Sequence, residues 1–371
     1  MIKISNSQTP WLEILLKFGF SNKPFVFENW ATESWEARRK WVNLDGTPNV
    51  EYLKTTFGNS KVPIALENGD VISQSFEEYL DFGKSPEKYL KDWHFQNEFG
   101  TSCYQKLHPF LSRDFVNREK WTENRDENPF GDDYRFVYYG ASGSWTKFHS
   151  DVVSSHSWSA NICGRKLWIM VPPGKEHLFA GLEDIREKSE IFEENGVFEF
   201  VQEAGEIVFV PSNWYHQVHN LTETISINHN WINSTNLHLV FDFIKNRNSD
   251  VLRELKDCED LYDRKEFEDQ IELVLFADAR LNKARFSKLC ELVMESRKIQ
   301  EGKFWKCDEH GEELHLCISH PKCHPKILKI CSCSQNFCEK CLNFIESLEF
   351  SISRHFFSRA QDAFRRTAID F

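Results

Sequence analysis

Two histidines and one aspartate in the middle of the chain have the residue types and spacing of a metal site. His149 and Asp151 come shortly after residues 135–139, which are mostly aromatic or β-branched and favour a strand. Side chains two residues apart on a strand share a face, so His149 and Asp151 should project the same way. His216 follows a second apolar segment, residues 206–210. Two imidazoles and one carboxylate are a ligand set for Fe(II) that leaves coordination positions open.

A plainer interpretation of these residues is a core histidine with satisfied hydrogen bonds and an aspartate at the surface. Lys166 bears on the choice, because it begins the otherwise strongly apolar segment 166–171. A lysine on such a strand is either an edge residue facing water or a buried cation that requires an anion. The second interpretation implies an anionic cosubstrate near His149.

Residues 224–231 alternate strictly between apolar and polar side chains. The polar set that shares one face is Thr224, Ser226, Asn228 and Asn230. An ordinary half-buried strand would turn this face to water, whereas a barrel that encloses a polar ligand would turn it inward. Thr146, three residues before His149, could add a hydroxyl group to the same anion site.

The elements that must position these residues are predominantly strands. Residues 134–234 contain strand patterns separated by turn signals at intervals typical of an all-β barrel or sandwich. Because no intervening segment is long enough for a crossover helix, we predict antiparallel pairing in a jelly roll. Residues 1–133 mix helical and strand patterns, and we expect them to pack on the barrel. The predicted class is mixed α+β.

From residue 235 onward the pattern becomes helical. Phe286, Leu289, Cys290 and Val293 fall on one stripe of a helix. Residues 235–371 are therefore predicted to form a helical, cysteine-rich C-terminal region. Neither its role nor the oligomeric state of the protein follows from this pattern.

The cysteine-rich part is a candidate zinc site. Seven cysteines lie close together: Cys307, Cys317, Cys323, Cys331, Cys333, Cys338 and Cys341. Cys338-x-x-Cys341 has the spacing of a zinc knuckle, and Cys331-x-Cys333 could complete a four-sulfur structural site. The alternative is a group of free thiols that pack as small apolar side chains.

The amino-acid composition restricts the cellular location and the classes of binding partner that we expect for this protein. The formal charge is −12, from 45 Lys and Arg against 57 Asp and Glu, and no basic run is dense enough for direct nucleic-acid binding. An acidic protein tolerates a basic protein substrate. No apolar run approaches the ~18 residues of a membrane span, and the N-terminal pattern is not that of a signal peptide. The odd total of 11 cysteines argues against a secreted disulfide framework, so we expect a reducing, cytoplasmic location.

In combination, the motifs of this region resemble the JmjC-type 2-oxoglutarate oxygenases. They are Thr146-x-x-His149-x-Asp151, Trp158, Gly164-Arg165-Lys166-x-Trp168, Val210-Pro211-x-x-Trp214-Tyr215-His216 and Asn220. The resemblance covers roughly residues 20–240. It implies that the jelly roll is the cupin-like double-stranded β-helix of this family. It also implies that the protein uses Fe(II), the cosubstrate 2-oxoglutarate and O₂.

The resemblance also assigns roles to single residues. His149, Asp151 and His216 would be the iron ligands and form the catalytic centre. Lys166 would pair with the distal carboxylate of 2-oxoglutarate, and Thr146 would hydrogen-bond to it.

Three further positions match less directly. Tyr89 and Asn228 stand where relatives often add contacts to the cosubstrate. Ser159 stands where one relative has an asparagine near the cosubstrate.

Within the family, the closest resemblance is to a protein lysyl hydroxylase that acts in translation termination. The implied activity is hydroxylation of a lysine side-chain carbon in the eukaryotic peptide-chain release factor. A histone N-methyl-lysine demethylase is the first alternative, because hydroxylation of an N-methyl carbon releases it as formaldehyde at the same kind of iron centre. A non-catalytic, metal-bound β-barrel that serves as an interaction module is the second. The metal ligands do not separate the two enzymes, whereas the intact triad and Lys166 argue against the module.

Overall fold

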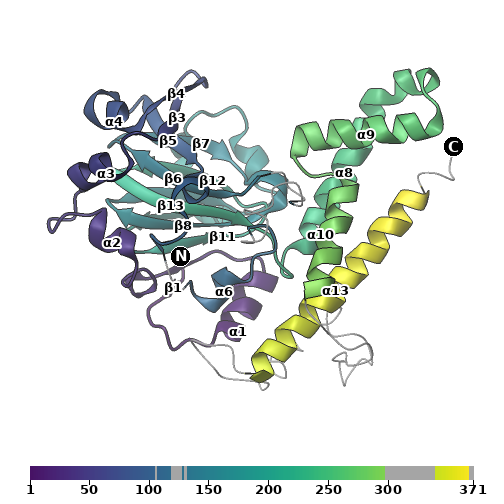
Figure 1. Ribbon diagram of the computed structural model, residues 1–371, viewed down its shortest axis with the longest axis horizontal. Helices are drawn as coiled ribbons and strands as arrows, with labels where there is room; N and C mark the ends of the chain where they lie inside the picture. Colours follow the sequence, from purple (N-terminus) through teal and green to yellow (C-terminus); the bar gives the residue numbers. More distant parts are fainter. Residues whose placement is uncertain (105–106, 118–127, 129–131, 297–338, 367–371) are drawn as a thin grey trace.

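Two β-sheets and a set of flanking helices make up the computed structural model, which describes residues 1–104, 107–117, 128, 132–296 and 339–366 (Figure 1). The major sheet has nine strands in the spatial order β1 (Lys3–Ile4), β2 (Phe25–Phe27), β11 (Ile207–Val210), β8 (His156–Cys163), β13 (Thr224–Trp231), β6 (Arg135–Gly140), β5 (Lys88–Trp93), β3 (Lys61–Leu66) and β4 (Val71–Ser75). The minor sheet has four, in the order β10 (Phe198–Gln202), β9 (Lys166–Val171), β12 (Tyr215–Asn220) and β7 (Trp145–His149).

All the strand pairs in these sheets are antiparallel except β1 with β2. The predicted mixed α+β class with a jelly-roll core is thereby confirmed. Strands of the N-terminal region extend the major sheet at both edges, because β2 pairs with β11 and β5 pairs with β6.

The alternation predicted for residues 224–231 decides which side chains face the space between the sheets. Ile225, Ile227 and Trp231 belong to the main hydrophobic core. The opposite face of β13 carries Ser226 and Asn230, whose side chains bond to Lys166 of β9 and to Asp151. The polar face is therefore turned inward, as expected of a barrel that encloses a polar ligand.

Helices cover the sheets on two sides of the molecule (Figure 1). The short N-terminal helices are α1 (Trp11–Ile14), α2 (Glu36–Lys40), α3 (Val50–Phe57), α4 (Phe76–Glu78), α5 (Phe95–Phe99) and α6 (Pro109–Ser112). The C-terminal helices are α8 (Leu237–Leu255), α9 (Arg264–Ala279), α10 (Lys283–Ser296) and α13 (Glu339–Arg366). They lie together at the opposite side from α2 and α3.

The predicted apolar stripe of α10 is confirmed, since Phe286, Leu289, Cys290 and Val293 are all buried in the main core. Helix α13 packs against α10. An ion pair between Arg113 and the fully buried Glu349 ties α13 to the segment after α6. Within the described ranges, no helix combines the length and the apolar character that crossing a bilayer requires.

The cysteines from Cys307 to Cys338 lie outside the described residues. The zinc site therefore stays a prediction.

Candidate metal centre and cosubstrate pocket

His149, Asp151 and His216 come together because two of them lie on neighbouring strands of the minor sheet and Asp151 lies two residues beyond the end of one strand. His149 ends β7, and His216 stands directly opposite it in β12. The two imidazole centroids are 4.3 Å apart. One potential ligand atom from each of the three side chains lies within 4.8 Å of the other two. This spacing suits a single metal ion held by all three side chains.

Both imidazoles are oriented by backbone carbonyl groups. His149 Nδ1 lies 2.7 Å from the carbonyl oxygen of Lys147, and His216 Nδ1 lies 3.2 Å from that of Trp214. A carbonyl oxygen can only accept, so each Nδ1 carries the hydrogen and each Nε2 keeps its lone pair for a metal. Burial, together with the neighbouring His149, lowers the pKa of His216 to about 4. His216 is therefore neutral near pH 7, as a metal ligand must be.

The carboxylate of Asp151 is held at both oxygens. Ser157 Oγ donates to Oδ2 at 2.6 Å, and Asn230 Nδ2 donates to Oδ1 at 2.8 Å. The chain reverses between Asp151 and Ser157 through Val153 and Ser154, whose φ angles of 58° and 51° lie in the left-handed region. A β-branched residue rarely adopts this conformation, and such strain concentrates at functional sites. Asp151 is thus fixed by its neighbours before any metal binds.

Lys166 is buried, so the interpretation as a water-facing edge residue is wrong. It shares the face of β9 that carries Trp168 and Met170, and 2% of its surface is exposed. Its Nζ donates to Ser226 Oγ at 2.7 Å. Among the described residues, no carboxylate lies within ion-pair distance of Nζ. Burial lowers the Lys166 pKa to about 7, and an anion bound here would reverse that effect.

A small inner cavity of about 60 Å³ joins Lys166 to the triad. Its walls include all the residues that the sequence suggested for the cosubstrate: Thr146, Lys166, Tyr89, Asn228 and Ser159. The hydroxyl of Ser159 is buried without a hydrogen-bond partner. A buried polar group without a partner is costly, so an acceptor on a ligand would satisfy it.

Thr146 reaches this cavity because β7 contains a bulge. His149 pairs with His216, but Thr146 pairs with Val218, which leaves one extra residue in β7 between the two pairs. In a regular strand, residues three apart point to opposite faces. The bulge lets Thr146 and His149 line the same cavity.

Asn228 and Tyr89 are also placed by specific contacts. Asn228 Nδ2 lies 3.1 Å from Ser226 Oγ, so Ser226 connects Asn228 with Lys166. Burial raises the pKa of the Tyr89 phenol to about 12. Gly140 makes room for the ring, because a Cβ at this position would lie 2.7 Å from Tyr89 Cε2. Tyr89 is therefore a rigid, neutral wall of the cavity.

These residues fit a metal ion and a dicarboxylate. The triad offers two imidazole nitrogens and a carboxylate with fixed orientation. A buried cation and nearby hydroxyl and amide groups can bind an anionic oxygen. Sequence reasoning missed the roles of Ser157 and Ser226. Side chains two residues apart on a strand share a face. The position of Ser157 beside the site could therefore have been predicted from that of Ser159, which lies on the same face of β8.

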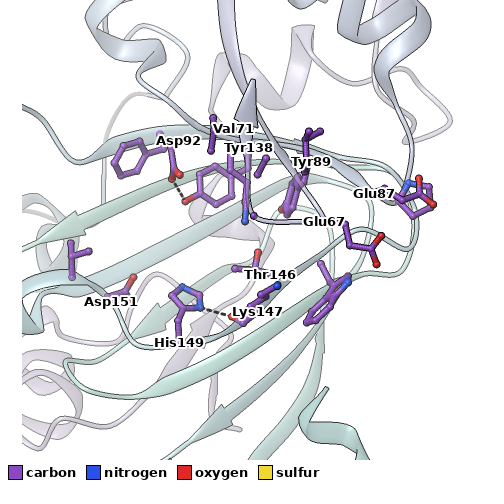
Figure 2. Close-up of a pocket in the computed structure, with 18 of the residues that line it drawn as sticks. Glu67, Val71, Glu87, Tyr89, Asp92, Tyr138, Thr146, Lys147, His149 and Asp151 are labelled. Atoms are coloured by element: carbon purple, nitrogen blue, oxygen red, sulfur yellow. Dashed lines mark hydrogen bonds between the residues drawn. The ribbon is translucent and has the colours of Figure 1, made fainter. Parts of the chain in front are cut away.

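A wider outer cavity of about 780 Å³ opens beside the triad (Figure 2). It shares His149, Asp151, Thr146, Tyr89 and Tyr138 with the inner cavity. Its other walls carry the carboxylates of Glu67, Glu87 and Asp92, the lysines Lys91 and Lys147, and the rings of Tyr134, Phe136 and Trp145. A long substrate side chain could reach the triad through this space.

A second group of metal-binding residue types, His94, Asp132 and Asp133, is already occupied by internal contacts. Asp133 pairs with Arg135 at 2.7 Å and with His94 at 2.8 Å. The hydrogen bond to Asp133 raises the pKa of His94, which favours an ion pair over a metal ligand. We regard this group as structural.

Comparison with known proteins fits this architecture. The family described as a cupin-like domain matches residues 12–236. The "2-oxoglutarate and iron-dependent oxygenase JMJD4" of Danio rerio is 35% identical over 80% of this chain and 75% of its own length. The human protein of the same name is 34% identical over 76% of this chain and 73% of its own length.

The chain belongs to the cupin-like JmjC family. Another relative of this JmjC protein, from Arabidopsis thaliana, is named "Arginine-specific demethylase JMJ20". It is 34% identical over 70% of this chain and 63% of its own length. The names of the relatives thus include both an oxygenase and a demethylase.

Proposed function

We propose that this protein is an Fe(II)- and 2-oxoglutarate-dependent oxygenase that hydroxylates a lysine side-chain carbon of the eukaryotic peptide-chain release factor. The observation that carries the proposal is that His149 and Asp151 line two cavities, an inner one and an outer one. The inner cavity also contains His216 and the buried Lys166, whereas the outer cavity is wider and contains neither. This arrangement allows a small anion and a large substrate to approach one metal ion from different directions.

In this proposal, His149 Nε2, His216 Nε2 and the Asp151 carboxylate hold the iron. Lys166 binds the distal carboxylate of 2-oxoglutarate, and Thr146 lies within the same cavity. Bound iron, with 2-oxoglutarate and O₂, would supply the oxidant that converts a C–H bond to C–OH while 2-oxoglutarate becomes succinate and CO₂. The protein's own contribution is to exclude water from the inner cavity and to hold one substrate carbon beside the metal.

Support for a basic substrate side chain comes from the outer cavity. Glu67, Glu87 and Asp92 give it an acidic character, only partly offset by Lys91 and Lys147. The aromatic rings of β6 can pack against a long aliphatic chain and attract its cationic end. Support for the release factor comes from the sequence motifs, which most resemble its lysyl hydroxylase. We expect this protein to encounter the release factor in the cytoplasm.

Demethylation is the second candidate, because one relative is named an arginine-specific demethylase. A histone N-methyl-lysine or an N-methyl-arginine would also suit an acidic, aromatic cavity. The two reactions differ in the fate of the hydroxylated carbon. It stays on the product in the first reaction and leaves as formaldehyde in the second. A non-catalytic interaction module would not require the buried Lys166 beside an inner cavity.

Mass spectrometry of purified release factor tests the proposal directly. We expect one added oxygen on a lysine after incubation with the protein, Fe(II), 2-oxoglutarate and O₂. The reaction without 2-oxoglutarate and the Asp151→Ala variant serve as controls and should give no product. Loss of methyl groups from a methylated histone peptide, with formaldehyde released and the release factor unmodified, would replace hydroxylation by demethylation. Failure to convert 2-oxoglutarate with any of these substrates would favour the interaction module.

A further inference from the structure

We propose that Asp92 is the specificity-determining residue that receives the cationic end of the substrate side chain in the outer cavity. This inference rests on the proposed function, because it requires a lysine as substrate. It goes further by naming the group that positions the lysine relative to the triad. Neither the sequence motifs nor the metal ligands assign any role to Asp92.

A bulge in β5 turns Asp92 into the cavity. Leu90 pairs with Tyr139 of β6, and Trp93 pairs with Val137, so β5 has one extra residue between the two pairs. Leu90 and Trp93 both face the hydrophobic core, which a regular alternation would not allow for residues three apart. The bulge resolves this by directing both Lys91 and Asp92 into the outer cavity.

The backbone of Asp92 adopts the left-handed conformation, with a φ angle of 59°. Aspartate tolerates this region better than most residues, but glycine would adopt it without strain. An aspartate in a strained bulge beside a candidate active site suggests that the carboxylate, and not the local fold, is what this position needs.

Tyr138 fixes the carboxylate toward the triad. Its hydroxyl donates to Asp92 Oδ1 at 2.7 Å, and Figure 2 shows the two side chains meeting across the cavity from His149. Tyr138 lines both the inner and the outer cavity. Burial and the neighbouring Asp92 carboxylate raise the pKa of Tyr138, so its hydroxyl stays protonated and can donate to Asp92. Tyr138 therefore bridges the distance between Asp92 and the metal centre.

The carboxylate of Asp92 remains available for a cation. In the described part of the chain, no Lys, Arg or His nitrogen lies within 4.0 Å of it, and Oδ2 accepts no hydrogen bond. The nearby Lys91 extends over the Tyr89 ring, 5.5 Å from its centroid. Lys147 lies 3.8 Å from Glu183. An incoming ammonium group would therefore find an oriented acceptor that no internal ion pair occupies.

The rings of β6 form the path along which the substrate would reach Asp92. Phe136 and Tyr138 share one face of this strand, Tyr134 directly precedes the strand, and all three line the outer cavity. A lysine side chain needs an apolar path for its methylene groups and an acceptor at its end. The stripe supplies the path, and Asp92 supplies the acceptor.

The test compares hydroxylation of purified release factor by the wild type and by Asp92→Asn. We expect the KM for the release factor to rise about 10- to 100-fold, as for loss of a charge-assisted hydrogen bond. Asp70→Asn is the matched control, since Asp70 is an exposed carboxylate at the β3–β4 turn and does not line the cavity. Asp92→Gly is a second variant that removes the carboxylate and relieves the backbone strain, so it should fold at least as well.

Tyr138 is a positioning residue in this scheme, and a double-mutant cycle tests it. Tyr138→Phe should raise the KM for the release factor, but Asp92→Asn with Tyr138→Phe should be no worse than Asp92→Asn alone. Independent effects would instead multiply. Multiplying effects would show that Tyr138 does not act through Asp92.

The outcomes separate this inference from the proposed function. If the wild type hydroxylates the release factor and both Asp92 variants keep its KM, the inference is overturned and the proposed function stands. If the release factor is not modified at all, the proposed function fails, and peptides with a central lysine, arginine, glutamine or norleucine become the probes. A preference of the wild type for the cationic peptides that Asp92→Asn abolishes would support the role of Asp92. No such preference would refute it.

Discussion

Replacing Lys166 by methionine should separate cosubstrate binding from folding. Methionine has a similar length and no charge, so it can occupy the buried position without leaving a large cavity. The lost interaction is a charge-assisted pair with a carboxylate, worth about 1.5–3 kcal/mol. Since about 1.4 kcal/mol corresponds to a factor of ten, the Kd for 2-oxoglutarate should rise about 10- to 100-fold.

The Lys166→Met substitution should weaken cosubstrate binding, but it should stabilise the ligand-free protein. Burial lowers the Lys166 pKa to about 7, whereas an unfolded lysine titrates near about 10.4. Between pH values of about 7 and about 10.4, Lys166 is protonated in the unfolded chain but largely neutral in the folded protein. The free energy of unfolding therefore rises with pH across this range because of Lys166. Below pH 7 the folded protein carries the full cost of burying the charge. The Met variant should therefore have the higher Tm at pH 6, and its advantage should shrink toward pH 10.

The binding assay is calorimetric titration of 2-oxoglutarate under anaerobic conditions with Fe(II) present. For the wild type, affinity should fall above pH 7, because less of the free protein has a protonated Lys166. The affinity of Lys166→Met should lack this component of the pH dependence. A Met variant that binds 2-oxoglutarate like the wild type would refute the assignment of Lys166. A lower Tm of the Met variant at pH 6 would refute the account of its burial.

Three further expectations concern metals. His149→Ala and Asp151→Ala should abolish succinate formation while leaving the circular dichroism spectrum unchanged, and near-normal turnover in either would disprove the metal assignment. Asn230→Ala removes one of the two hydrogen bonds to Asp151 and should weaken iron binding about 10- to 100-fold, measured by competition with a chelator. Protein prepared without oxidation and stripped of iron should retain about one equivalent of zinc if the cysteines between Cys307 and Cys341 bind it; its absence would leave them as free thiols.

Local patterns predicted the strands that carry the site. The limits of β9 and β13 agree with the apolar segment 166–171 and the alternating segment 224–231. These patterns were sufficient because the side-chain period of a strand is a local property of the backbone. The same property predicted that Ser226 and Asn230 share a face, although it did not determine what that face contacts.

The position of Lys166 could not be decided in this way. Its environment depends on Ser226, which belongs to the other sheet, and on the pairing of β9 between β10 and β12. Strand order is set by contacts between distant parts of the chain, and a single apolar strand does not encode its neighbours. Only the assembled sheets show that this lysine is buried.

By itself, the sequence determined the residue types of the site and the chemistry available to His149, Asp151, His216 and Lys166. The tertiary structure decided which of them meet and what else joins them. Two bulges illustrate the reason, because an extra residue in β7 or β5 reverses the alternation that the sequence pattern assumes. One of them brings Thr146 beside His149, and the other directs Asp92 into the outer cavity. A bulge exists only relative to a partner strand, so neither position could be read from its own segment.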